Sequence, residues 1–165
     1  MPRLWFALLV SILLSACASS RNNNYYPPHL SPGHKLATLA GSAAPPVSSQ
    51  ERAIAYVAKV NGQFVYDAKR TVSQPIELKP GVHEVGLAWN QDNLYATVVM
   101  TLNAEPGQRY VIRHEPLTGS QVKLWIENEA THAAVTEAKI VAAAAPFSSS
   151  SAAIAPLVMN WLRVR

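Results

Sequence analysis

The sequence predicts an all-β fold, a small antiparallel β-sandwich within a chain of 165 residues. Short runs rich in β-branched and aromatic residues recur from residue 53 onward, and turn residues separate them at spacings of about ten residues. No helical pattern lies between these runs, which disfavours a parallel α/β architecture. Although 49% of the residues are hydrophobic, many of them are clustered alanines. One domain that is smaller than the whole chain is therefore expected.

Six runs are the expected strands of a sandwich domain that spans residues 51–141. They cover residues 53–60, 71–78, 82–89, 94–104, 108–115 and 121–128. Turn sequences rich in Asn, Gly and Pro separate them, at residues 61–62, 80–81, 90–93, 106–107 and 119–120. Pro75 makes the second run an edge strand or a bulge, because proline cannot donate to a strand ladder. A last element at residues 133–141 fits either a strand or a short helix.

Alternation assigns the two faces of the longer strands, because successive side chains of a strand point to opposite sides. In the third run, Val85, Leu87 and Trp89 share the inward face, with His83 at its rim. In the fourth run, the even-numbered residues from 94 to 102 are all apolar and are expected to face the core. In the sixth run, Trp125 is left on the outward face.

One stretch carries a likeness to known domains. Residues 76–89, IELKPGVHEVGLAW, follow KVNG at residues 59–62. A strand ending in leucine, a Pro-Gly turn and a strand with histidine and alternating aliphatics resemble the small prealbumin-like sandwiches of bacterial surface proteins, including PEGA-type and carboxypeptidase-regulatory-like domains. The string GQRYVIRHE at residues 107–115 also matches a Gly-x-x-Tyr strand start in such lipoproteins, although the letters PEGA do not occur. The resemblance implies a fold and carries no chemistry.

Residues 1–16 are typical of an export signal. Arg3 supplies a positive charge, residues 4–14 form an apolar stretch, and Ser15 and Ala16 are small. The apolar stretch is shorter than the roughly 20 residues that span a bilayer. We therefore expect the segment to be cut away.

The string LSAC at residues 14–17 resembles the lipobox of bacterial lipoproteins, in which a branched aliphatic residue and two small residues precede an invariant cysteine. The resemblance implies that Cys17, the only cysteine of the chain, receives a diacylglyceryl group, becomes the first residue of the mature protein and is acylated on its amine. Several acyl chains, at about 0.8 kcal/mol per buried methylene, hold a protein firmly at a membrane. The alternative is a free or buried cysteine behind a signal without a lipid.

Two further points concern the same cysteine. Ala18 follows it where an aspartate would favour retention at the inner membrane, so the resemblance implies an outer-membrane protein that faces the periplasm. A single cysteine also excludes an internal disulfide, so the fold must depend on its core.

Low-complexity segments flank the predicted domain. Residues 17–50 are rich in Asn, Ser, Pro and Gly, which predicts a flexible linker behind the lipidated cysteine. Extended at about 3.3 Å per residue, such a linker would reach on the order of 100 Å. Residues 142–165 form a low-complexity tail. On a helix, Leu157, Trp161 and Val164 would share one face, so the last nine residues either remain disordered or dock on a membrane or partner.

Charge and motifs exclude several classes of function. The net charge is +4, but most of the 14 lysines and arginines are scattered singly, so the clustered basic stripe of a nucleic-acid groove is missing. His29 and His34 have no cysteine or carboxylate beside them and do not predict a metal site. No phosphate-binding glycine loop, GxSxG, HExxH or cysteine pair occurs, so no cofactor and no enzymatic activity are expected.

Three histidines, His83, His114 and His132, lie in different predicted strands or turns with glutamates nearby in sequence. They would form a catalytic or metal site only if the fold brought them together with a nucleophile or a further ligand. We expect them instead to be rim or surface residues.

The loop WNQDN, residues 89–93, is the strongest candidate for a binding site. Trp89 and Tyr95 lie beside Asn90 and Asp92, and rings beside amides and carboxylates are the groups that recognise sugars. The outward-facing Trp125 would add a second platform. The alternative is an Asn-rich hairpin turn whose side chains bond their own backbone, with Trp89 in the core.

The sequence thus predicts a lipid-anchored, non-catalytic envelope protein that acts as a binding or scaffolding module. Its partners would be the membrane, through Cys17, and an envelope protein or glycan. A carbohydrate or peptidoglycan binder would require Trp89 and Trp125 to be exposed together, and a hydrolase would require the histidines to meet in one cleft. A structural role would show as an exposed apolar edge or patch.

Overall fold

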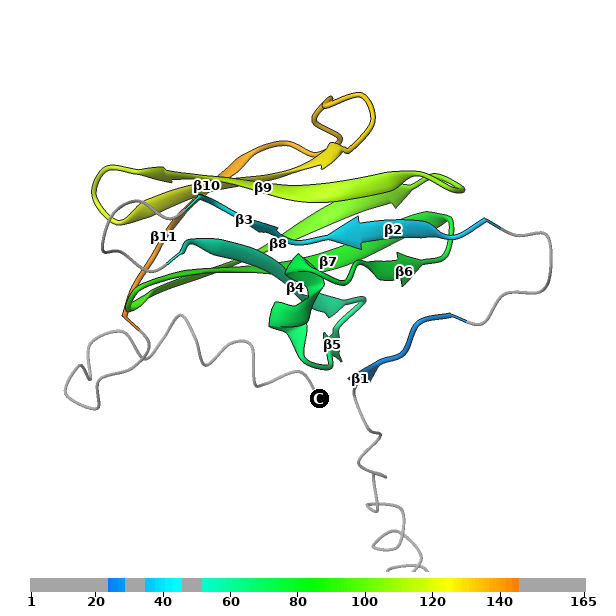
Figure 1. Cartoon of the computed structure of the whole chain (residues 1–165), viewed down its shortest axis with the longest axis horizontal. Coiled ribbons are helices and arrows are strands. Elements are labelled where there is room, and N and C mark those ends of the chain that lie inside the picture. The colour runs from blue at the N-terminus through cyan, green and yellow to red at the C-terminus, as the bar shows by residue number, and fades with distance from the viewer. Residues whose placement is uncertain (1–23, 29–34, 46–51, 146–165) are drawn as a thin grey trace, which may run out of the picture.

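The computed structural model describes residues 24–28, 35–45 and 52–145 and shows two β-sheets packed face to face (Figure 1). The predicted all-β sandwich is confirmed. Residues 1–16, Cys17, His29, His34 and the tail from residue 146 lie outside the described residues, so what the sequence predicts for them stays a prediction. In the described part of the chain, no helix has the length and apolar character needed to cross a membrane.

The first sheet has the strand order β1-β5-β4-β7-β8, with β3 also paired to β4. Its strands are β1 (Asn24–Tyr25), β3 (Ser42–Ala43), β4 (Ile54–Val60), β5 (Gln63–Val65), β7 (Gly81–Gln91) and β8 (Leu94–Ala104). The hairpin of β7 and β8 pairs along all 11 residues of each strand without a register shift. This long hairpin forms one side of the sheet, and the short β1 forms the opposite edge.

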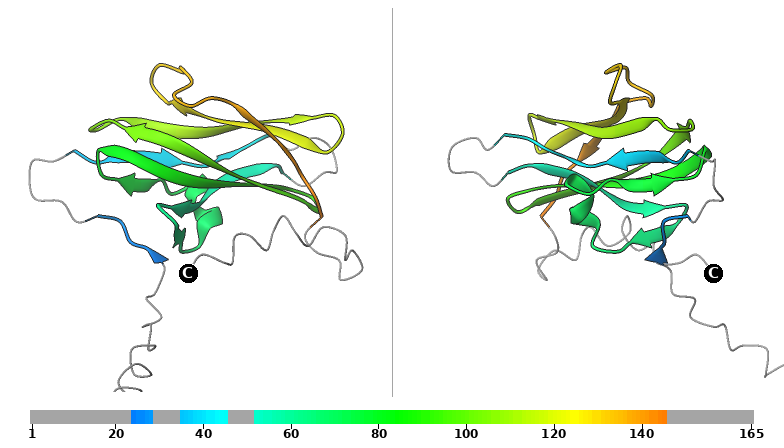
Figure 2. Two further views of the ribbon diagram at one scale, coloured as in Figure 1. Left: turned by 180° about the vertical axis from the view of Figure 1, so that it is seen from behind. Right: turned by 45° about the vertical axis from the view of Figure 1, so that its right-hand side comes forward.

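The second sheet has the order β11-β10-β9-β2-β6. Its strands are β2 (Ala37–Ala40), β6 (Ile76–Leu78), β9 (Arg109–Leu117), β10 (Gln121–Asn128) and β11 (Lys139–Ala142). The β9–β10 hairpin turn and β1 lie toward opposite ends of the sandwich in both Figure 1 and Figure 2.

Two strand pairs depart from the predicted antiparallel arrangement. β1 runs parallel to β5, and β2 runs parallel to β9. Hairpin loops force neighbouring strands to be antiparallel, whereas β1 and β2 reach their partners through long connections that leave either direction open.

The core confirms the predicted alternation. Val85, Leu87 and Trp89 of β7 are buried, and the even-numbered residues of β8 from 96 to 104 are buried between exposed or half-buried odd-numbered ones. Trp89 pairs across the sheet with Ala55 on one side and Ala96 on the other. These two small side chains leave room for the indole inside the sandwich.

The predicted linker is wrong for residues 35–45, which enter the sandwich as β2 and β3. Ala37 and Leu39 are fully buried, because β2 lies between β6 and β9 in the second sheet. Gly41 joins the two strands at a point where a Cβ atom would clash with the Ala55 carbonyl oxygen and with Val72. Small residues are therefore needed for this close approach, and the same small residues gave the segment its linker-like composition.

The second predicted strand, residues 71–78, is only partly correct. A 3₁₀ helix, η2 (Ala68–Val72), occupies its first part, and β6 begins directly after Pro75 as the edge strand that the proline predicted. Thr71 is 2% exposed and attaches η2 to the sheets. Its hydroxyl accepts the Val57 amide at 3.0 Å, and its carbonyl accepts the Gly41 amide at 2.8 Å.

The C-terminal end of the domain forms a strand rather than a helix. The segment that holds β11 pairs with β10 and then crosses to the first sheet, where Ala144 exchanges two backbone hydrogen bonds with Tyr95. Ala143 is buried, so the folded part extends beyond the predicted boundary at residue 141.

Candidate binding surface

Large aromatic side chains gather where β1 meets β5 at the edge of the first sheet. We call the group Tyr25, Tyr26, Phe64 and Tyr66 the aromatic corner. Tyr26 is 65% exposed, Phe64 51% and Tyr66 81%. Soluble proteins rarely expose large rings together without a use for them. An exposed apolar patch is the feature that the sequence analysis associates with a structural role, but the sequence did not predict its place in the fold.

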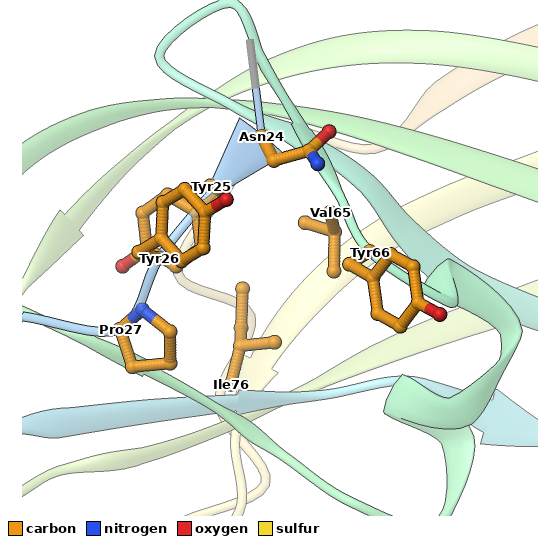
Figure 3. A pocket seen from close by; sticks show the side chains of 7 residues that line it. All are labelled: Asn24, Tyr25, Tyr26, Pro27, Val65, Tyr66 and Ile76. Atoms are coloured by element: carbon orange, nitrogen blue, oxygen red, sulfur yellow. The ribbon is translucent and has the colours of Figure 1, made fainter. Parts of the chain in front are cut away.

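A pocket of about 470 Å³ opens within the aromatic corner (Figure 3). Tyr66 stands on one side and Tyr25 with Tyr26 on the other, and Ile76 of the second sheet lies below them. The remaining lining residues are Asn24, Pro27 and Val65. The pocket is therefore mostly apolar, with tyrosine hydroxyls and one amide as its polar groups.

The pocket wall is held by both sheets. Asn24 pairs with Phe64 and Tyr25 with Val65, which places β1 beside β5. The Tyr25 hydroxyl donates a hydrogen bond of 2.5 Å to the carbonyl of Glu77 in β6. Burial, and then the Glu77 carboxylate, raise the pKa of Tyr25, so its hydroxyl keeps the proton that this bond needs.

Two adjacent tyrosines, Tyr25 and Tyr26, form the same wall of the pocket but differ in exposure. Tyr25 is half-buried and hydrogen-bonded to Glu77, whereas Tyr26, just beyond the end of β1, is 65% exposed. The sequence NNNYYPP, residues 22–28, predicts a linker because it has no apolar period. The doubled tyrosine was the one signal of a surface here, and it could not show which distant strand would accept it.

Charged groups surround the aromatic corner. The Lys59 ammonium lies 4.2 Å from the centre of the Phe64 ring, a cation–π contact. Lys69 and Arg70 lie on η2, just after Tyr66, and the Arg70 guanidinium lies 4.0 Å from the Asp67 carboxylate. Lys79 and Glu77 are exposed in and beside β6.

The candidate loop at residues 89–93 is not an open platform. Trp89 is 2% exposed and lies in the core, so its ring is not available to a sugar. Asp92, with φ of 50°, forms part of the tight turn between β7 and β8 beside the half-buried Asn90. The prediction of a sugar site around Trp89 is therefore wrong, because alternation along β7 directs the indole inward.

Tyr95 and Trp125 lie apart from each other as well. Tyr95 is 37% exposed on the outer face of the first sheet, and its hydroxyl is hydrogen-bonded to Tyr56. Burial, and then Tyr95, raise the pKa of Tyr56 to about 12. Trp125 is half-buried on the second sheet, where its indole Nε1 donates to Glu127 at 2.9 Å. The structure does not bring the five predicted ligand-binding residues together.

The histidines do not converge either. His83 Nε2 donates to the Lys79 carbonyl at 2.7 Å, and its Nδ1 lies 3.1 Å from the Asn61 side chain, so it fastens two turns. His132 lies in a turn of the second sheet with φ of 56°. Among the residues that the structure describes, no group of three His, Cys, Asp or Glu side chains could hold a metal ion.

His114 contacts a possible nucleophile, the Ser42 hydroxyl. Its Nδ1 lies 3.1 Å from the hydroxyl of Ser42, and this contact joins the two sheets. Burial, and then the Arg113 charge, lower the pKa of His114 and favour the neutral ring. Within residues 24–28, 35–45 and 52–145, its buried Nε2 has no hydrogen-bond partner, whereas a serine–histidine pair in a hydrolase needs a third group that orients the base. The arrangement therefore lacks the geometry of a triad.

The long edge of β8 is protected against a further strand. Ala144 occupies the outward backbone groups of Tyr95, and the Lys139 ammonium donates to the Val99 carbonyl at 2.9 Å. A crossing segment and a lysine are common means of blocking strand addition. An exposed sheet edge for assembly is therefore not the prominent feature of this side, and the aromatic corner remains the main candidate.

Comparison with protein-family profiles, with curated proteins and with solved structures finds no match to this chain.

Proposed function

We propose that the chain is a lipid-anchored, non-catalytic envelope protein whose sandwich acts as a binding or scaffolding module on the periplasmic side of the outer membrane. The aromatic corner is its binding surface. The single observation that carries this proposal is a pocket at one edge of the fold that Tyr26 and Tyr66 line, with Phe64 beside it on β5; all three rings are more than half exposed.

The anchor is supported by the sequence at the N-terminus. A positive residue, an apolar stretch of signal length and the string LSAC occur in the order that lipoprotein processing requires. Cys17 would then carry the lipid, and the domain behind it would remain in the periplasm. The prealbumin-like character suggested by residues 76–89 belongs to the same proposal, since such sandwiches occur in bacterial surface proteins.

The aromatic corner supports a binding role because exposed rings are costly to leave in water. Tyrosine offers a large apolar face and a hydroxyl, the combination that is enriched where proteins meet partners. The wall is also preorganised: the Tyr25 hydroxyl is fixed to Glu77 before any partner arrives. Rigid walls lower the entropy that binding must overcome.

Two rival functions lose their support. A sugar site built on Trp89 fails because that ring lies in the core. A hydrolase built on the histidines is not favoured, because His83 and His114 belong to different sheets and each is engaged with its own neighbours.

The anchor is tested by metabolic labelling with a fatty acid. The wild-type chain should take up the label and Cys17→Ser should not. Equal labelling of the two chains would refute the anchor.

The binding surface is tested by crosslinking in the native envelope. A photoreactive residue replaces Tyr66 in one chain and Thr118 of the β9–β10 turn in the matched control; both positions are exposed, and they follow strands of different sheets. Position 66 should give specific adducts that position 118 does not give. If both positions give the same adducts, or neither gives any, the aromatic corner is not the binding surface.

A further inference from the structure

We infer that the partner of the aromatic corner is the lipid surface itself, so that Tyr26, Phe64 and Tyr66 lie in the headgroup layer of the membrane that holds Cys17. This inference rests on the proposed lipidation. It turns the exposed patch into an orienting device, because a protein that touches the bilayer at one corner presents a defined opposite end to the periplasm.

The chain between Cys17 and β1 is short. Asn24, the first residue of β1, follows Cys17 by only seven residues. At 3.3 to 3.6 Å per residue, this stretch spans at most about 25 Å even when fully extended. The linker of about 33 residues predicted from composition would have allowed on the order of 100 Å. A lipid at Cys17 thus keeps the aromatic corner close to the headgroups.

The exposed rings of the aromatic corner are of the type found at membrane interfaces. Tyrosine is enriched at membrane interfaces, because its ring enters the boundary region while its hydroxyl stays hydrated. Tyr26 and Tyr66 have this character, and the exposed Phe64 adds a purely apolar ring.

Basic side chains near the aromatic corner favour an anionic lipid surface. The Lys59 ammonium lies over the Phe64 ring, and Lys69 and Arg70 follow Tyr66 on η2, where the Arg70 guanidinium lies 4.0 Å from the Asp67 carboxylate. A basic side chain near an anionic lipid surface adds electrostatic attraction, which salt screens. The Lys59 ammonium over the Phe64 ring combines an apolar contact and a cation at one place.

The aromatic corner lies at an edge of the first sheet. β1 is the edge strand of the first sheet, and β5 and η2 lie beside it on the same side of the sandwich (Figures 1 and 2). The β9–β10 turn lies toward the other end. A bilayer that contacts β1 and β5 therefore leaves this turn in water.

The test uses the lipidated full-length protein in vesicles of phosphatidylethanolamine and phosphatidylglycerol. Lipidation consumes the only native thiol, so a cysteine introduced by Tyr66→Cys or, as the control, by Thr118→Cys takes up an environment-sensitive fluorophore alone. Both native side chains are exposed, so neither change should unfold the domain. The vesicles also contain lipids that carry a nitroxide quencher in the headgroup region.

The label at position 66 should shift to the blue and be quenched severalfold more than the label at position 118. Adding Phe64→Ser to the Tyr66→Cys chain should reduce this quenching, because one ring no longer anchors the corner. Equal quenching at the two positions, or no effect of Phe64→Ser, would overturn the inference.

Flotation of the vesicles separates this outcome from failure of the anchor. If the chains do not float with the vesicles, lipidation itself has failed and the proposed function falls with it. If they float but the label at position 66 stays in water, only the lipid contact is wrong. A label at position 66 that is shielded in whole envelopes but not in protein-free vesicles assigns the corner to a protein partner and also overturns the lipid contact.

Discussion

Replacing Thr71 by valine should destabilise the sandwich, because the Thr71 hydroxyl forms hydrogen bonds to both η2 and β4. Thr71 is 2% exposed, and its Oγ1 accepts the Val57 amide at 3.0 Å and donates to the Ala68 carbonyl at 2.8 Å. Valine has nearly the same shape but no hydroxyl, so the Val57 amide would be buried without a partner. An unpaired buried donor costs about 1 to 3 kcal/mol.

The expected loss is therefore about 2 kcal/mol in the free energy of unfolding, or a fall in Tm on the order of 10 °C for a domain of this size. Urea unfolding of the chain from residue 18 onward measures the loss, and hydrogen exchange at the Val57 amide reports its cause. Thr71→Ser is the matched control, because it keeps the hydroxyl and should keep the protection of that amide.

The reasoning would be refuted by a Thr71→Val chain that unfolds within about 0.5 kcal/mol of the wild type, the range of ordinary surface substitutions. It would also fail if the Val57 amide remained protected without the hydroxyl. Faster exchange of that amide in Thr71→Ser as well would assign the effect to packing rather than to the hydrogen bond.

Three further predictions concern the core and its titrating groups. Leu39→Ala should lower the free energy of unfolding in urea by about 2 to 5 kcal/mol, since Leu39 is fully buried. An unchanged midpoint would contradict the burial of β2 in the core. The raised pKa of Tyr56, about 12 in the folded state, means that the folded chain holds this proton more tightly than the unfolded chain. Stability should fall as pH rises from about 10 to 12, and a fall of the same size in Tyr56→Phe would contradict this. The lowered pKa of His114 has the opposite sense: its contribution is present above the usual histidine pKa and is lost as pH falls below it. His114→Gln should flatten that part of the stability curve in pH-dependent unfolding, and an unaltered slope would exclude the role.

The strands that alternate over many residues were predictable from the sequence. β7 and β8 together bury a continuous set of apolar side chains, and the period of two fixes which residues face inward. The inward position of Trp89 followed from the same rule, although its loop was also a candidate sugar site. Packing settled the conflict, because Ala55 and Ala96 provide the space that the indole fills.

The short elements were not predictable, because their stability comes from distant partners. β1 and β3 are two residues long, and β2 is four, so none carries a detectable period. Each forms only when another strand supplies hydrogen bonds and a buried face. The aromatic corner depends on one of these elements, β1, and so its place in the fold was hidden even though its tyrosines are evident in the sequence.

The pairing of β2 with β9 has a consequence for the order in which the molecule assembles. Thr38 lies beside Arg109, so a loop of about 70 residues must close before this part of the second sheet can form. A chain made from its N-terminus displays Leu39 long before β9 exists to cover it. Non-local strand pairs of this kind slow folding. The N-terminal strands should therefore be the last to settle, after the β7–β8 and β9–β10 hairpins have formed from neighbours in the sequence.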